Sequence, residues 1–132
     1  MEHRPAVAGS PRVLLRLEGS ALFVAATVAY AFVGESWWFY ALAFFAPDLS
    51  FAAYRAGPRV GAAAYNAVHT TVLPAVLALV GFVLDASILL ALASILAAHV
   101  GFDRMLGYGL KYPTAFSDTH LGRIGRPAGA AT

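Results

Sequence analysis

Four long apolar stretches constrain this chain more than any other feature of its sequence. They cover residues 13–33, 37–54, 60–84 and 87–106, and each is close to the roughly 20 residues that a helix needs to cross the hydrocarbon core of a bilayer. The runs are continuous and rich in Ala and Leu, without the alternation of apolar and polar residues that is typical of strands. Because the connectors are only a few residues long, neighbouring spans must be antiparallel. We therefore predict an all-α fold, an antiparallel up-down four-helix transmembrane bundle.

Composition excludes the main alternatives to a membrane protein. The chain is 60% hydrophobic and 12% charged, whereas soluble domains carry about 25% charged residues. Too few charges remain to cover a surface that faces water. The absence of cysteine excludes disulfides, thiolate nucleophiles and metal sites built on cysteine. The first apolar stretch is longer than the roughly 7–15 residues of a signal-peptide core, which favours a retained span.

The basic residues predict the orientation of the bundle. All nine lie before or at the start of the first span, between the second and third, or at and after the end of the fourth: Arg4, Arg12, Arg16, Arg55, Arg59, Arg104, Lys111, Arg123 and Arg126. These positions share one side of an even-numbered bundle. The connectors on the opposite side carry Glu35 and Asp85 instead. By the positive-inside rule, we expect both termini in the cytoplasm.

Five acidic or histidine residues lie inside the predicted spans, namely Glu18, Asp48, His69, His99 and Asp103. Such groups are costly at membrane depth and usually serve a function. With a rise of about 1.5 Å per residue, the first four of these lie roughly 8–15 Å from the arginines at the span ends. His99 and Asp103 are four residues apart and share a helix face. The sequence therefore predicts one polar layer in the cytoplasmic half of the bundle.

Two carboxylates and two imidazoles are a ligand set that zinc, iron or manganese accepts, and four-helix bundles are known to hold such sites. The predicted metal ligands are Glu18, Asp48, His69 and His99, and Asp103 is a candidate for a fifth. The predicted catalytic residues are Asp103, Asp118 and His120, and the predicted substrate-binding residues are Tyr65, Asn66, Tyr108 and Lys111. Each of these residues also has a simpler interpretation, as a hydrogen-bonded helix end, an interfacial ion pair, a helix cap or a packing residue. The spacings alone do not form a specific metal-binding motif.

The sequence also predicts how the chain is organised around the spans. Pro47 and Pro74 fall inside the second and third spans, where each should kink its helix. We expect residues 1–12 to be a flexible N-terminus and residues 126–132 a disordered tail. Residues 107–125 are too polar to span and too apolar for a free linker. We expect this segment to fold back over the cytoplasmic end of the bundle as a cap.

Five separated motifs resemble a known family. They are RLEG (16–19), APDLS (46–50), AGPRVGAAAYNAVHT (56–70), AHVGFDRMLGYGLKYP (98–113) and DTHLGRIG (118–125). In this order they resemble the small bacterial integral-membrane family catalogued as domain of unknown function 4260, over roughly residues 12–125. The resemblance implies a four-span protein of the bacterial inner membrane. It implies no particular activity or substrate.

Several functions are compatible with the polar layer. The leading hypothesis is a metal-dependent membrane enzyme that acts on a lipid-like or small amphipathic substrate. Alternatives are a small proton-coupled transporter, a structural or accessory subunit whose polar layer specifies helix packing, and a metal-free acid/base isomerase or cyclase on an isoprenoid-like substrate. The expected partners are the lipid bilayer and a second copy of the chain, through the small residues 61–64. Nucleic-acid binding is not expected, because lipid headgroups account for the basic residues.

Overall fold

The computed structural model describes residues 6–125 and is mostly helical, as predicted. Its elements are α1 (Gly9–Val33), α2 (Trp37–Phe44), the 3₁₀ helix η1 (Ala46–Ala56), α3 (Pro58–His69), α4 (Val72–Val83), α5 (Ser87–Leu106), β1 (Asp118–Thr119) and β2 (Gly122–Arg123). Three segments are long and apolar enough to cross a membrane: α1, the bent pair α3–α4, and α5. The second predicted span differs, because α2 is short and continues as η1.

Each break in a helix lies just before a proline. In the second span, α2 ends at Phe44 and η1 begins two residues later, around Pro47. In the third span, α3 ends at His69 and α4 begins at Val72, two residues before Pro74. A proline has no N–H to bond the carbonyl four residues earlier, and its ring crowds that carbonyl. The two predicted interruptions are therefore present, and the first also changes the helix type.

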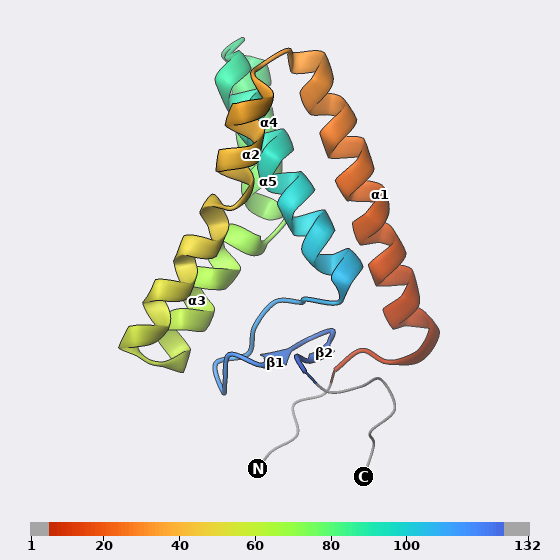
Figure 1. Cartoon of the computed structure of the whole chain (residues 1–132), viewed down its shortest axis with the longest axis vertical. Coiled ribbons are helices and arrows are strands. Elements are labelled where there is room, and N and C mark those ends of the chain that lie inside the picture. The colour runs from red at the N-terminus through yellow and green to blue at the C-terminus, as the bar shows by residue number, and fades with distance from the viewer. Residues whose placement is uncertain (1–5, 126–132) are drawn as a thin grey trace.

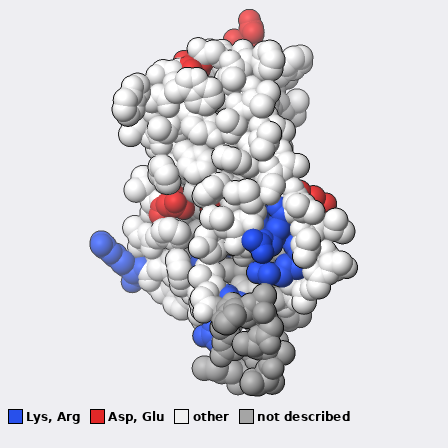
Figure 2. Space-filling model, turned by 45° about the vertical axis from the view of Figure 1, so that its right-hand side comes forward, with Lys and Arg blue, Asp and Glu red and all other residues white. Residues whose placement is uncertain are grey.

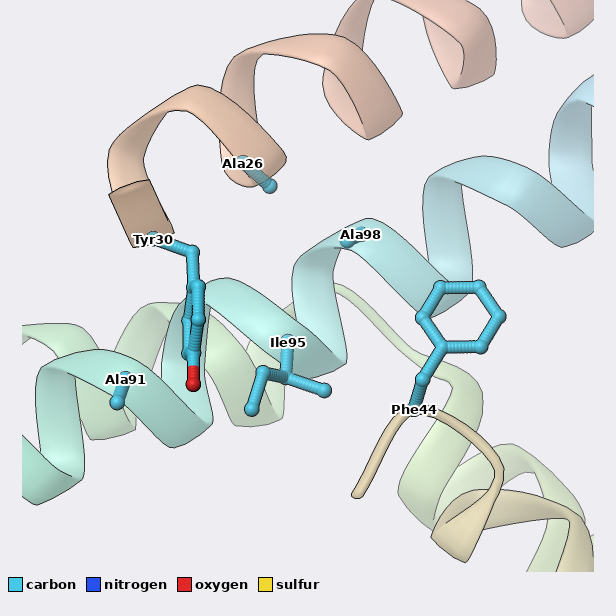
Figure 3. Packing of buried hydrophobic residues seen from close by; sticks show 6 residues of the cluster. All are labelled: Ala26, Tyr30, Phe44, Ala91, Ile95 and Ala98. Carbon is cyan, nitrogen blue, oxygen red and sulfur yellow. The ribbon is translucent and has the colours of Figure 1, made fainter. Parts of the chain in front are cut away.

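Helix α5 lies at the centre of the fold, with α1 along one side and α4 along another. The pair α3–η1 diverges from α1 toward the lower end of the molecule in Figure 1, and the chain after α5 crosses between them. Toward the upper end, the core consists of apolar residues from α1, α2 and α5. Figure 3 shows six of them: Ala26, Tyr30, Phe44, Ala91, Ile95 and Ala98. The fold thus has an apolar core toward one end and opens at the other.

Helices α1 and α5 touch through their backbones. A Cβ atom added at Gly19 would lie 2.5 Å from Arg104 Cβ, and one added at Gly101 would lie 2.6 Å from the Gly19 carbonyl oxygen. No side chain fits at either position. Small residues allow this close approach, which is common where helices associate in membranes. The contact fixes which face of α1 is turned inward.

The segment after α5 folds back over the open end of the bundle. It begins at Gly107, whose φ of 90° ends the helix in the left-handed region. The side chain of Asn66 on α3 then pairs with the backbone of Lys111: Asn66 Nδ2 donates to the carbonyl at 2.8 Å, and Lys111 N donates to Asn66 Oδ1 at 2.7 Å. From the other side, Arg12 Nε donates to the Leu121 carbonyl at 2.6 Å. We call residues 107–125 the cap.

The outer surface separates by charge. In Figure 2, the basic residues of the visible face lie in the lower part, and a broad band above them carries no Lys or Arg. Large apolar side chains on the outside of the helices are exposed, for example Phe32, Trp38 and Phe82. Helix α1 begins at Gly9, inside the segment predicted to be flexible. Residues 1–5 and the predicted disordered tail 126–132 lie outside the described residues.

Candidate metal centre

Four side chains from three elements meet where the helices diverge. Asp48 comes from η1, His69 from α3, and His99 and Asp103 from α5. Each offers one nitrogen or oxygen donor, and these four atoms lie within 4.8 Å of one another. Three of these residues are buried and Asp48 is half-buried. We call this group the His/Asp cluster; it could hold a metal ion.

The spacing of the donor atoms is that of a coordination shell. The two Nε2 atoms, of His69 and His99, are 3.1 Å apart. Asp48 Oδ1 lies 3.4 Å from each of them, and Asp103 Oδ2 lies 3.6 Å from His69 Nε2 and 3.3 Å from His99 Nε2. The corners of a tetrahedron with metal–ligand bonds of about 2.0–2.1 Å are about 3.3–3.4 Å apart. The five distances therefore fit one ion placed among the four donors.

The interruptions in the helices position two of these ligands. His69 is the last residue of α3, directly before the break, and Asp48 lies in the first turn of η1, directly after Pro47. His99 and Asp103 lie one turn apart on the continuous helix α5. Broken helices are tolerated at membrane depth where the freed backbone groups find partners. Here Arg104 donates to the carbonyl of His69 at 3.2 Å.

The ring of His69 is held in the orientation of a metal ligand. Its Nδ1 donates to the carbonyl of Tyr65 at 2.8 Å, and the ring stacks on Tyr65 with a centroid distance of 3.6 Å. With the proton on Nδ1, the lone pair is on Nε2, which faces the cluster. Histidine ligands usually make this kind of second bond to a carbonyl or carboxylate, which fixes the tautomer.

Among the described residues, the two carboxylates of the cluster lack a paired lysine or arginine to balance their negative charge. The side chains of His69 and His99 are 1% and 2% exposed. Within residues 6–125, no Lys or Arg forms an ion pair with Asp48 or Asp103. Buried carboxylates need a charged partner or a metal to offset their loss of hydration. A bound divalent ion would supply that positive charge to both carboxylates.

A cavity of about 280 Å³ adjoins the cluster. It is lined by both carboxylates, Asp48 and Asp103, and by side chains from η1, α3 and the cap: Phe51, Tyr65, Tyr108, Lys111, Phe116 and Ile124. The side chain of Asp48 is 36% exposed, far more than the two histidines. A small molecule in this cavity would therefore lie beside the carboxylates of the cluster.

The structure brings three of the four predicted ligands together, Asp48, His69 and His99. The fourth member of the cluster is Asp103, which the sequence assigns a catalytic role. Glu18 lies outside the cluster, and its side chain on α1 is exposed. It directly precedes Gly19, which is packed against α5, and neighbouring residues of a helix point about 100° apart.

The other two predicted catalytic residues hold the cap together. Asp118 accepts a hydrogen bond from Thr114 Oγ1 at 2.6 Å and pairs with Arg123 at 3.7 Å. His120 Nδ1 accepts from the Leu110 N–H at 2.9 Å. Burial, and to a lesser extent the charge of Arg104, lowers the pKa of His120, which favours this neutral acceptor form. Neither residue lines the cavity.

The predicted substrate-binding residues divide in the same way. Tyr65, Tyr108 and Lys111 line the cavity. Asn66 instead ties α3 to the cap through the backbone of Lys111. Sequence reasoning missed the apolar cavity walls at Phe51, Phe116 and Ile124. The signal for Phe116 was its apolar character within an otherwise polar segment, but an apolar residue alone does not reveal what it packs against.

Residues 12–124 match the family described as Domain of unknown function (DUF4260). The chain belongs to this family. The resemblance found in the five motifs is thereby confirmed. No curated protein and no solved structure matches the chain. The family description assigns no activity, so any function must be argued from the geometry of the His/Asp cluster and its cavity.

Proposed function

We propose that this protein is a metal-dependent membrane enzyme that acts on a lipid-like or small amphipathic substrate. The observation that carries the proposal is the set of donor distances of 3.1–3.6 Å among Asp48, His69, His99 and Asp103. Two imidazoles and two carboxylates suit zinc, iron or manganese. Such an ion would polarise a substrate oxygen or activate a water molecule.

The surroundings of the cluster support an enzyme over a purely structural centre. Structural metal sites are closed, whereas catalytic sites keep a coordination position for water or substrate; an ion held by the four donors of the His/Asp cluster would take a substrate oxygen as a fifth ligand from the cavity. Here the 280 Å³ cavity reaches both carboxylates and has a wall of aromatic side chains and one lysine. Residues on the outer side of η1, such as Leu49, are exposed as for contact with lipid. An amphipathic molecule could therefore place its polar end in the cavity and keep its apolar part in the bilayer.

The same geometry gives less support to a proton-coupled carrier. A carrier needs polar groups along a path through the membrane. The buried ionisable residues of the His/Asp cluster lie where the helices diverge, while the core toward the other end is built from residues such as Ala26, Ala91 and Ile95. We further propose that the open end with its basic residues faces the cytoplasm of a bacterial inner membrane.

Elemental analysis of the detergent-purified protein tests the proposal. We expect about one Zn, Fe or Mn per chain, and a loss of at least tenfold in His69→Gln and His99→Gln, because each removes a nitrogen ligand. His120→Gln is the matched control, since that histidine bonds within the cap, and it should keep its metal. A wild-type protein without bound metal, or an equal loss in all three variants, would refute the metal centre.

A further inference from the structure

The wall of the cavity contains a lysine, Lys111, that is almost completely buried. Lys111 is only 5% exposed, and its Nζ donates to the carbonyl of Phe116 at 2.7 Å. The same atom lies 3.6 Å from the centroid of the Phe116 ring and 4.7 Å from that of Tyr65. Burial lowers the pKa of Lys111 to about 8, so the side chain is still mostly protonated at neutral pH.

This buried charge has no carboxylate directly beside it. Among residues 6–125, no Asp or Glu forms an ion pair with Lys111. An ammonium group has three N–H donors, and the Phe116 carbonyl takes one of them. Buried charges usually have a partner. The charge of Asp103, which lines the same cavity, acts on Lys111 without forming an ion pair with it, so a ligand in the cavity could accept from the remaining N–H donors.

The net charge around the cavity indicates the sign of that ligand. A divalent ion cancels the two carboxylates of the His/Asp cluster, and the two histidines are neutral as ligands. Lys111 then leaves one positive charge. An anionic group would neutralise it, and a group with several oxygens could reach the metal and the ammonium at the same time.

We propose that the cavity binds the phosphate headgroup of an anionic lipid, with one phosphate oxygen at the metal and another at the ammonium of Lys111. This assignment rests on the proposed metal centre and names the substrate class for it. A volume of about 280 Å³ corresponds to roughly nine water molecules at about 30 Å³ each. A phosphate headgroup fits in that space, and the acyl chains would stay in the bilayer.

Hydrogen bonds fix the position of Lys111 relative to the proposed metal ligands. The side chain of Asn66 pairs with both backbone groups of Lys111, and Asn66 lies three residues before His69 on α3. The Phe116 carbonyl holds the ammonium from within the cap. The His/Asp cluster, which would hold the metal, and Lys111 are therefore joined by one helix and one pair of hydrogen bonds, which would fix the distance between two binding points for one headgroup.

The test uses the full-length protein loaded with Co²⁺ in detergent, and titrates it with dihexanoyl phosphatidic acid. Binding is followed by the visible absorption of the metal and by calorimetry. We expect Lys111→Met to retain the metal and to bind this lipid at least about tenfold more weakly, which is the order expected for one charge-assisted hydrogen bond. Arg123→Met is the matched control, because Arg123 is exposed and pairs with Asp118 in the cap. It should bind as the wild type does.

Two further titrations of the wild type separate the possible sources of the signal. Dihexanoyl glycerol has the same chains without the phosphate and should not bind, a result that does not depend on how any variant folds. Inorganic phosphate should bind more weakly than the lipid. Metal-loaded Lys111→Met with unchanged lipid affinity, binding of the neutral lipid, or equal affinity for inorganic phosphate would each overturn the assignment. A wild-type protein that takes up no metal would instead refute the proposed function.

Discussion

At the scale of single residues, the centre depends on how its histidines are oriented. His69 makes three contacts, two that orient its ring and one that satisfies its backbone carbonyl. Its Nδ1 bonds the Tyr65 carbonyl, its ring stacks on Tyr65, and its own carbonyl accepts from Arg104. With the proton on Nδ1, the lone pair of Nε2 is directed at the cluster. Tyr65 therefore positions a ligand without being one.

This role predicts a difference between two substitutions of Tyr65. Tyr65→Ala removes the ring that stacks on His69, and we expect metal affinity to fall by about 10–100-fold, as for other groups that orient ligands. Tyr65→Phe keeps the stacked ring and loses only the hydroxyl, which lies 3.5 Å from Asp103, so its affinity should stay within a few-fold of the wild type. Competition with a chromophoric chelator measures both. Equal affinities in the two variants would contradict the role of the ring.

At the scale of elements, the two broken spans and the contact between α1 and α5 set the position of the site. The prolines could be seen in the sequence, and with them the breaks beside Asp48 and His69. Depth could also be counted along each span, so all four cluster members were predicted to lie in the polar layer, three of them as metal ligands. What one sequence does not show is how far each helix is rotated about its axis.

Glu18 illustrates this limit. Its depth is right for the polar layer, but Gly19 is the residue of α1 that packs against α5, and Glu18 is turned away from the cluster. Asp103 takes the fourth position because α5 is central and presents His99 and Asp103 on one face. The roles of Asp118 and His120 were equally hidden, because short hydrogen bonds within the cap use both side chains.

The close approach of α1 and α5 predicts a steric effect. Gly19→Ala places a Cβ about 2.5 Å from Arg104 Cβ, and overpacking of this kind costs about 1–3 kcal/mol. We expect a lower midpoint of thermal unfolding in detergent. Ala21→Val adds bulk on an exposed position of the same helix and should leave the midpoint nearly unchanged. A variant at Gly19 as stable as the wild type would show that the two helices do not pack this closely.

At the scale of the whole molecule, the two ends of the protein differ in charge. The His/Asp cluster, its cavity and the cap lie toward the end that carries the basic residues, and the apolar core lies toward the other. In the orientation proposed above from the positive-inside rule, the cavity would lie on the cytoplasmic side. A substrate would enter the site from the inner leaflet or from the cytoplasm.

Because the chain has no cysteine, this orientation can be tested by introducing one cysteine at a time and labelling its thiol. Ser36→Cys lies in the α1–α2 connector, and Thr114→Cys lies in the cap; both positions are exposed. A membrane-impermeant maleimide should label the first in intact spheroplasts and the second only after the membrane is permeabilised. The reverse pattern would place the cavity on the outer side.

The central claim is that Asp48, His69, His99 and Asp103 bind one metal ion. The most direct test is the metal content of Asp103→Asn beside that of Glu18→Gln, measured on purified protein with the wild type as reference. Both changes neutralise one carboxylate within a membrane helix, but only Asp103 belongs to the cluster. We expect about one ion per chain in the wild type and in Glu18→Gln, and a loss of at least tenfold in Asp103→Asn. Metal retained in Asp103→Asn and lost in Glu18→Gln, or absent from the wild type, would contradict this claim.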